Sequence, residues 1–110
     1  MAIHLLAILS PKPEKLARVE ELARGLVNSV KQNEPGVTKY QWFHSGTPEE
    51  PKVVVWEVYA DAEAFETHKK NPKLGELGKL GKEEGLFAAP MQLLPLEQFA
   101  GFAAVEGAKI

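Results

Sequence analysis

The fold is decided by residues 33–74, which read NEPGVTKYQWFHSGTPEEPKVVVWEVYADAEAFETHKKNPKL. A tight Glu-Pro-Gly turn starts an aromatic strand over residues 37–44, and a polar segment rich in glycine and proline leads into a second strand over residues 53–59. Asp61 then caps a short helix that carries His68 and stops before an Asn-Pro pair. The pattern predicts a β-hairpin followed by a helix, which together gather His68, one strand carboxylate and several aromatic rings.

The residues before this stretch predict one strand and one long helix. Residues 2–9 form an apolar run broken only by a histidine, which is typical of a buried strand. Ser10 is then the expected helix N-cap, and Pro11 suits the first helical position. Apolar residues follow at spacings of three and four up to a helix end near Gln32, which predicts a one-sided amphipathic helix; they are Leu16, Val19, Ala23, Leu26 and Val30.

The residues after this stretch predict a second helical segment and a last strand. Asn71 and Pro72 repeat the signal of a cap followed by proline, and glycines stand at positions 75, 78, 81 and 85. Because glycine weakens a helix, this segment is either a tightly packed helix with a stripe of small residues or a loosely held flap that closes over a site. The last strand is expected at residues 91–99, at a sheet edge, since Pro95 lacks a ladder donor.

The order of these elements indicates an α+β domain. Strand, helix, two strands, short helices and strand is the ferredoxin-like βαββαβ arrangement, with an antiparallel sheet covered by helices on one face. The expected domain spans residues 1–99, and residues 100–110 form a C-terminal tail.

The strand at residues 53–59 is apolar on both faces. One face carries Val54, Trp56 and Val58, and the other carries Val53, Val55 and Tyr59. Helices on one side of the sheet leave the other side exposed, and an exposed apolar patch of this kind marks an interface. We therefore expect a homodimer that buries sheet against sheet.

Composition restricts the classes of function. The chain has 110 residues, 45% hydrophobic and 25% charged, a net charge of −2 and no cysteine. This balance gives no electrostatic basis for binding nucleic acid, and no apolar run is long enough to span a membrane. We expect a cytoplasmic protein; the alternative is a peroxisomal address in the C-terminal Ala108-Lys109-Ile110.

Three motifs carry a resemblance to a known family. The Glu-Pro-Gly turn at residues 34–36, the Val-Trp-Glu-Val-Tyr strand at 55–59 and the helix at 61–68 together resemble the antibiotic-biosynthesis monooxygenase family. The resemblance implies a dimeric α/β barrel with a pocket between sheet and helices in each subunit. It implies oxidation of phenolic or quinol-like substrates by O2 without metal or flavin, so no cofactor is expected, although the family also holds isomerases and haem-degrading enzymes.

Carried over by position, the family pattern matches the turn, Tyr40, Glu57 and His68. The resemblance makes His68 the acid/base residue and Glu57 its partner or a structural acid. The Asn-Trp-His set of haem degradation is incomplete, because the first strand offers His4 and no asparagine.

The catalytic candidates each have a structural alternative. His68 has the proton affinity that a general base needs near neutral pH, but a histidine near a helix end also packs well or interacts with the helix dipole. Glu57, in mid-strand, either acts in the site or pairs with a lysine such as Lys39. Tyr40 is expected to hydrogen-bond a substrate oxygen.

The substrate-binding candidates are aromatic or imidazole side chains, and the alternative is that they fill a core: Trp42, Trp56, Phe65, Tyr59 and His44. In the pocket interpretation, Trp42 and Trp56 sandwich a planar ring. His4, His44 and Glu57 would together be enough ligands for a metal site, but no local ligand spacing supports one, so no metal is expected.

These observations predict a cofactor-independent monooxygenase that acts on a small phenolic, quinol or anthrone-type compound with O2. Two alternatives stay open. One is a non-oxidative isomerase or lactone-handling enzyme that uses the same base, and the other is a non-catalytic protein that binds a small aromatic ligand.

Overall fold

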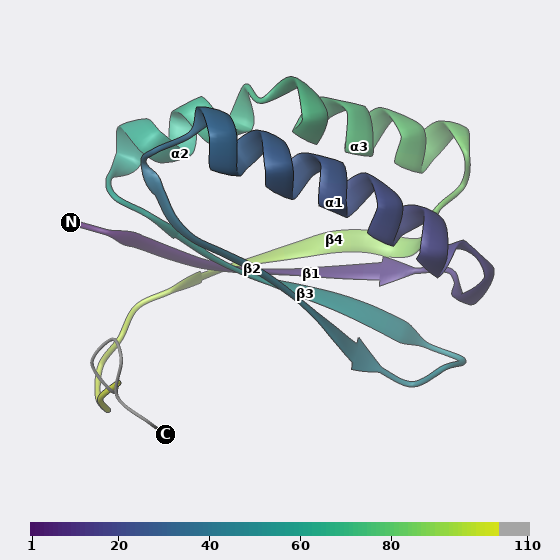
Figure 1. The fold of residues 1–110 in the computed structure, drawn as a ribbon. Coiled ribbons are helices and arrows are strands. Elements are labelled where there is room, and N and C mark those ends of the chain that lie inside the picture. The colour runs from purple at the N-terminus through teal and green to yellow at the C-terminus, as the bar shows by residue number, and fades with distance from the viewer. Residues whose placement is uncertain (104–110) are drawn as a thin grey trace.

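A computed structural model of the protein describes residues 1–103. Four strands and three α-helices follow one another along the chain (Figure 1). Their bounds are β1 Ile3–Pro11, α1 Leu16–Asn33, β2 Val37–Gly46, β3 Pro51–Tyr59, α2 Ala62–Lys69, α3 Pro72–Glu83 and β4 Phe87–Leu96, with a 3₁₀ turn, η1, at Pro13–Lys15. The C-terminal triplet considered above lies outside the described residues.

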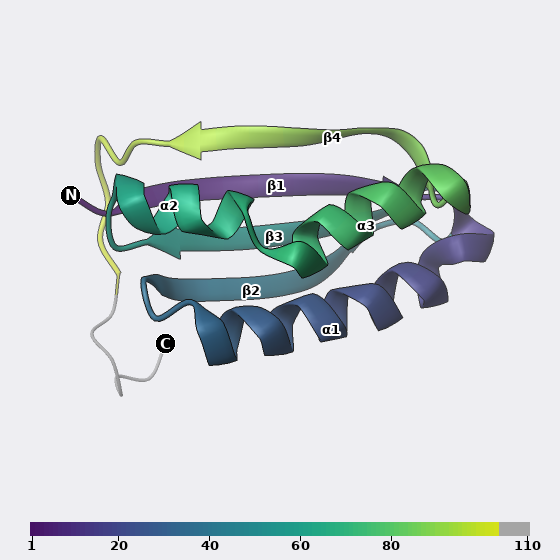
Figure 2. The ribbon, with the colours of Figure 1, turned by 90° about the horizontal axis from the view of Figure 1, so that it is seen from above.

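The strands form one antiparallel sheet in the order β2-β3-β1-β4. All three helices lie on the same side of it (Figure 1). This is the predicted α+β, ferredoxin-like βαββαβ arrangement. Seen from above, α2 and α3 run over the middle of the sheet, and β4 lies along an edge that no helix covers (Figure 2). Within residues 1–103 no helix is both long and apolar enough to cross a membrane.

Two predicted boundaries are wrong. Ser10 and Pro11 do not start a helix, because β1 continues through both of them and pairs Ser10 with Ala89 of β4. The Ser10 hydroxyl is no cap; it accepts a hydrogen bond from Lys52 Nζ at 2.9 Å. The last strand runs from Phe87 to Leu96 and not over residues 91–99, and it keeps Pro95 at the sheet edge.

The predicted caps of the two short helices are confirmed. Asp61 Oδ1 accepts a hydrogen bond from the backbone N–H of Ala64 at 2.9 Å, and Asn71 Oδ1 accepts one from that of Lys73 at 2.8 Å. Each cap satisfies a donor that a helix N-terminus leaves free. The glycine-bearing segment is a regular helix, α3.

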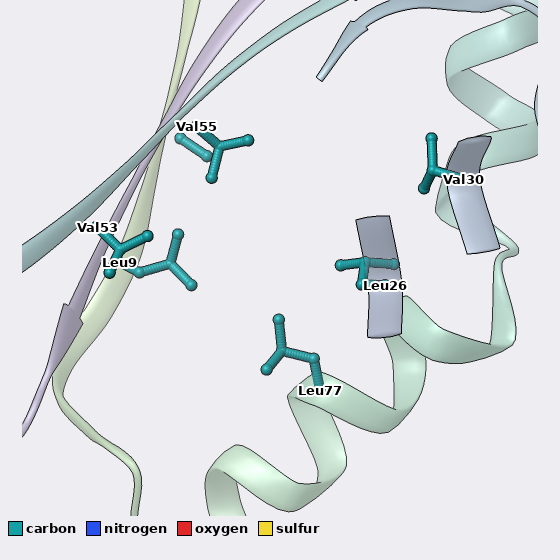
Figure 3. Packing of buried hydrophobic residues seen from close by; sticks show 7 residues of the cluster. Leu9, Leu26, Val30, Val53, Val55 and Leu77 are labelled. Carbon is teal, nitrogen blue, oxygen red and sulfur yellow. The ribbon is translucent and has the colours of Figure 1, made fainter. Parts of the chain in front are cut away.

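The core lies between α1, α3 and the inner face of the sheet. Leu26 and Val30 of α1 and Leu77 of α3 pack toward Val53 and Val55 of β3 (Figure 3). Leu9 of β1 completes this contact. The predicted amphipathic spacing of α1 therefore corresponds to its buried face.

The outer face of the sheet carries exposed apolar side chains. Phe43 is 48% exposed and Trp56 is 38% exposed, and Leu94 and Leu96 of β4 are exposed to a similar degree. Polar coverage is limited; Lys39 Nζ lies 3.8 Å from the centre of the Trp56 ring.

Candidate functional site

His68 is placed in the last turn of α2 with its side chain turned inward, and it is only 4% exposed. Its Nδ1 lies 2.9 Å from Glu34 Oε1. The rings of Tyr40 and Tyr59 pack against the imidazole, with centroids 5.3 and 5.4 Å away. His68 is therefore held by one carboxylate and two aromatic rings.

Glu34 stands at the C-cap of α1, where its backbone N–H donates to Val30 O. The carboxylate is buried, and besides His68 it accepts a hydrogen bond from Asn71 Nδ2. Glu34 thus joins the end of α1 to the end of α2 and the start of α3.

The turn that places Glu34 depends on the glycine at position 36. A Cβ on Gly36 would lie 2.6 Å from the Ala64 side chain of α2, which is closer than two carbon atoms approach without movement. Gly36 therefore lets α2 lie close to the turn, and the Glu-Pro-Gly sequence sets the distance between Glu34 and His68.

These contacts determine which ring nitrogen of His68 is free. An ionised carboxylate only accepts hydrogen bonds, so the proton of neutral His68 lies on Nδ1 and is donated to Glu34. Nε2 has no hydrogen-bond partner within the described residues, and the ring lines a cavity. His68 is thereby arranged as a proton acceptor.

The cavity lies between the sheet and the helices and has a volume of about 240 Å³. Five of the predicted site residues line it: His68, Tyr40, Glu57, Trp42 and Phe65. Lys69 adds one cationic side chain, and the remaining walls are apolar: Ala7, Leu9, Leu26, Val55, Leu74, Leu77, Met91 and Leu93.

Tyr40 supplies a hydroxyl donor to this cavity. Burial raises the pKa of Tyr40 above its usual range, and the nearby carboxyls of Glu57 and Glu34 raise it further. Tyr40 consequently keeps its proton at neutral pH. Its ring also meets that of Trp42 edge to face, with centroids 5.8 Å apart.

Glu57 is buried on the inner face of β3 and accepts a hydrogen bond from the hydroxyl of Tyr59. Desolvation raises the pKa of Glu57, and the bond from Tyr59 and the proximity of His68 oppose that rise. The alternative of a pair with Lys39 does not apply, because Lys39 lies over Trp56.

The raised pKa predicts a specific dependence of stability on pH. Since the folded-state value lies above the ordinary value of 4.5, the native state binds more protons at Glu57 than the unfolded state does between the two values. The free energy of unfolding therefore falls as pH rises through that window. Glu57→Gln removes this titration and keeps an acceptor for Tyr59, so we expect the variant to lose less stability on going to neutral pH, by on the order of 1 kcal/mol.

The measurement is urea unfolding of the two proteins at a series of pH values from 4 upward. Subtracting the two curves removes the contributions of other titrating groups. Parallel curves would show that Glu57 has no such pKa shift.

Three predicted binding residues lie elsewhere. Tyr59 is completely buried beside Glu57 and packs against Phe65. Trp56 points to the outer face of the sheet, so Trp42 and Trp56 do not sandwich a ring, and that interpretation is wrong. His44 is exposed near Glu20, with Nε2 3.7 Å from its carboxylate, and lines a separate cavity between α1 and β2.

The sequence interpretation missed Glu34 and Asn71 as members of the site. One local signal was available for Glu34: a carboxylate at a helix C-terminus is disfavoured by the helix dipole and so calls for another reason to be there. Within residues 1–103, His, Asp and Glu side chains form no group of three that could hold a metal ion.

Comparison with known proteins identifies the family of the chain. The family model described as antibiotic biosynthesis monooxygenase matches residues 2–78, which is more than half of the chain. No curated protein matches the chain.

Solved structures share the whole fold. A protein from Caulobacter crescentus, assigned to the antibiotic biosynthesis monooxygenases, is 28% identical, with a TM-score of 0.78 over 90% of this chain and 91% of that one. Rv0793 from Mycobacterium tuberculosis is 18% identical, with a TM-score of 0.77 over 94% of this chain and 100% of its own. The family model and these folds lead to one conclusion: the chain belongs to the antibiotic biosynthesis monooxygenase family.

Proposed function

We propose that this protein is a cofactor-independent monooxygenase that oxidises a small phenolic, quinol or anthrone-type compound with O2. The observation that carries the proposal is a buried imidazole beside an apolar cavity: its Nδ1 is bound to Glu34, and its other nitrogen has no hydrogen-bond partner among residues 1–103. Family membership supports a monooxygenase, and the cavity supports an aromatic substrate.

The size and lining of the cavity support this substrate class. A dry cavity of about 150 Å³ already binds benzene, so a cavity of 240 Å³ has room for a larger, fused-ring aromatic compound. The apolar walls match the faces of such rings. The polar groups on the residues that line it are few: the His68 nitrogen, the Tyr40 hydroxyl, the Trp42 indole N–H, the Glu57 carboxyl and the Lys69 ammonium.

In the proposed reaction, His68 Nε2 removes a proton from the phenolic hydroxyl or from the acidic ring CH₂ of an anthrone. The anion passes one electron to O2, and recombination of the two radicals forms a carbon–oxygen bond. The resulting peroxide anion takes the proton back from His68. The hydroperoxide then loses water, leaving one oxygen atom as a carbonyl and the other in the water. The electrons for reducing O2 come entirely from the substrate.

The protein's other groups assist the deprotonation. Tyr40 donates a hydrogen bond to the substrate oxygen as it becomes an anion, and Glu34 stabilises the imidazolium that forms on His68. The apolar walls exclude water, which strengthens both interactions.

We also propose that the protein is a homodimer through the outer face of its sheet. The support is the group of exposed apolar side chains on this face, among them Phe43, Trp56 and Leu94. Sedimentation at micromolar concentration is expected to show a dimer, and Leu94→Lys is expected to shift it to a monomer. A monomer in the unsubstituted protein would contradict this assignment.

Oxygen uptake tests the proposed reaction. The protein is mixed with naphthohydroquinone or anthrone, dissolved oxygen is followed with an electrode, and products are identified by mass spectrometry with labelled O2. We expect uptake above the spontaneous rate, and with anthrone one labelled oxygen in the product. Product formation without oxygen would instead favour an isomerase, and saturable binding without any product would favour a carrier.

A further inference from the structure

An apolar groove also runs between α3 and β4. Its volume is about 730 Å³, three times that of the cavity beside His68. Its walls are the following residues of α3, β4, β1 and the turn before β4: Leu9, Leu74, Leu77, Gly78, Gly81, Lys82, Gly85, Phe87, Ala88, Ala89, Pro90 and Met91. Lys82 is the only charged side chain among them.

The groove adjoins the His68 cavity. Four residues line both: Leu9, Leu74, Leu77 and Met91. A ligand with its ring beside His68 therefore has apolar surface leading away from it along α3. From Leu74 to Lys82 the helix rises about 12 Å, so the groove is long enough to hold an extended hydrocarbon substituent.

The glycines of α3 leave the groove open. A Cβ on Gly78 would meet no atom within 4 Å, so the space beside it is empty. At Gly81 a Cβ would lie 2.9 Å from the Phe87 ring, so the missing side chain lets that ring approach the helix. No helix covers β4 on the other side of the groove (Figure 2), and Met91 is exposed there.

We propose that the natural substrate is a phenol or quinol with a long apolar substituent, and that this substituent lies in the groove between α3 and β4. The proposal rests on the proposed function for the position of the reacting ring. Its position next to the His68 cavity favours this occupant over a second protein copy, because the shared walls lead toward the base.

Binding of a homologous series tests the proposal. Para-ethylphenol, para-butylphenol and para-hexylphenol are titrated by calorimetry under nitrogen, so that no oxidation interferes. Burial of each added methylene in an apolar site strengthens binding by about fourfold, and we expect this increment along the series.

Two glycine variants locate the chain. Gly78→Leu places a side chain in the empty space of the groove, and it is expected to abolish the increment while leaving the affinity for para-ethylphenol unchanged. Gly75→Leu is the matched control: it lies in the same helix, a Cβ there also meets nothing within 4 Å, and it lines neither cavity. It is expected to keep the full increment.

The outcomes separate the two proposals. If Gly78→Leu and Gly75→Leu show equal increments, the groove assignment is overturned; the proposed function still stands if short phenols bind and consume oxygen. If the increment is lost only in Gly78→Leu but no oxygen is consumed, the groove assignment stands and the proposed function is overturned. If no phenol binds, both proposals are overturned. If the unsubstituted protein and both variants lack the increment, and Gly78→Leu changes the oligomeric state, the groove is assigned to a second copy of the chain.

Discussion

His68→Gln is expected to lower the catalysed rate of oxygen uptake by a factor of about 10²–10⁴, the usual contribution of a positioned general base. Glutamine offers an N–H that can replace the bond from Nδ1 to Glu34, so the buried carboxylate keeps a donor. It has no basic nitrogen to accept the substrate proton. The loss should therefore appear in the chemical step, measured with an oxygen electrode at saturating quinol or anthrone.

His44→Gln is the matched control for this variant. It makes the same substitution at an exposed histidine that does not line the cavity. We expect its rate to equal that of the unsubstituted protein. If His68→Gln kept more than a tenth of the rate while para-ethylphenol still bound, His68 would not be the base.

Glu34→Gln is expected to lower kcat by about 10- to 100-fold and to leave KM nearly unchanged, as loss of a residue that orients a reactive group does. Glu34 lies behind the imidazole and does not line the cavity. The amide puts a donor where Asn71 or His68 already donates, so one of these bonds is lost. Unfolding should become easier by about 1–3 kcal/mol, since a buried polar group loses its partner.

Two readouts distinguish orientation from a merely structural role. Nitrogen NMR of His68 should report a proton held on Nδ1 in the unsubstituted protein and a mixture of tautomers in Glu34→Gln. In the double variant with His68→Gln, the substitution at Glu34 should have no further effect on rate, because it acts through the imidazole. Glu63→Gln, at an exposed glutamate of α2, serves as the control. Additive losses in the double variant would contradict the role of Glu34.

Local patterns in the sequence predicted most of the fold. The caps at Asp61 and Asn71 and the spacing on α1 depend on residues close together in the chain, so they could be read directly. Ser10 and Pro11 look like a helix start, but pairing of β1 with β4 and the bond from Lys52 keep them extended. Those partners are more than forty positions away, and no local pattern names them.

The site was predictable in part for the same reason. Alternation puts Tyr40 and Trp42 on one face of β2, and Trp56 and Glu57 on opposite faces of β3. The packing of the helices, which the alternation does not reveal, makes the face of Tyr40, Trp42 and Glu57 the inner one. Glu34 was missed because its partners His68 and Asn71 are 34 and 37 positions away. Only the packing of α2 against the turn, which Gly36 permits, brings them together.

The residues that hold the base and the residues that form the cavity walls are different, and this affects how such a protein changes its substrate in evolution. Glu34 and Asn71, which fix the imidazole, belong to helix ends, while Leu74, Leu77 and Leu93 shape the space in front of it. Mutations at the apolar positions alter the shape offered to a ligand and leave the hydrogen bonds of the base in place. A lineage can therefore explore new substrates one wall residue at a time without losing its reactive group.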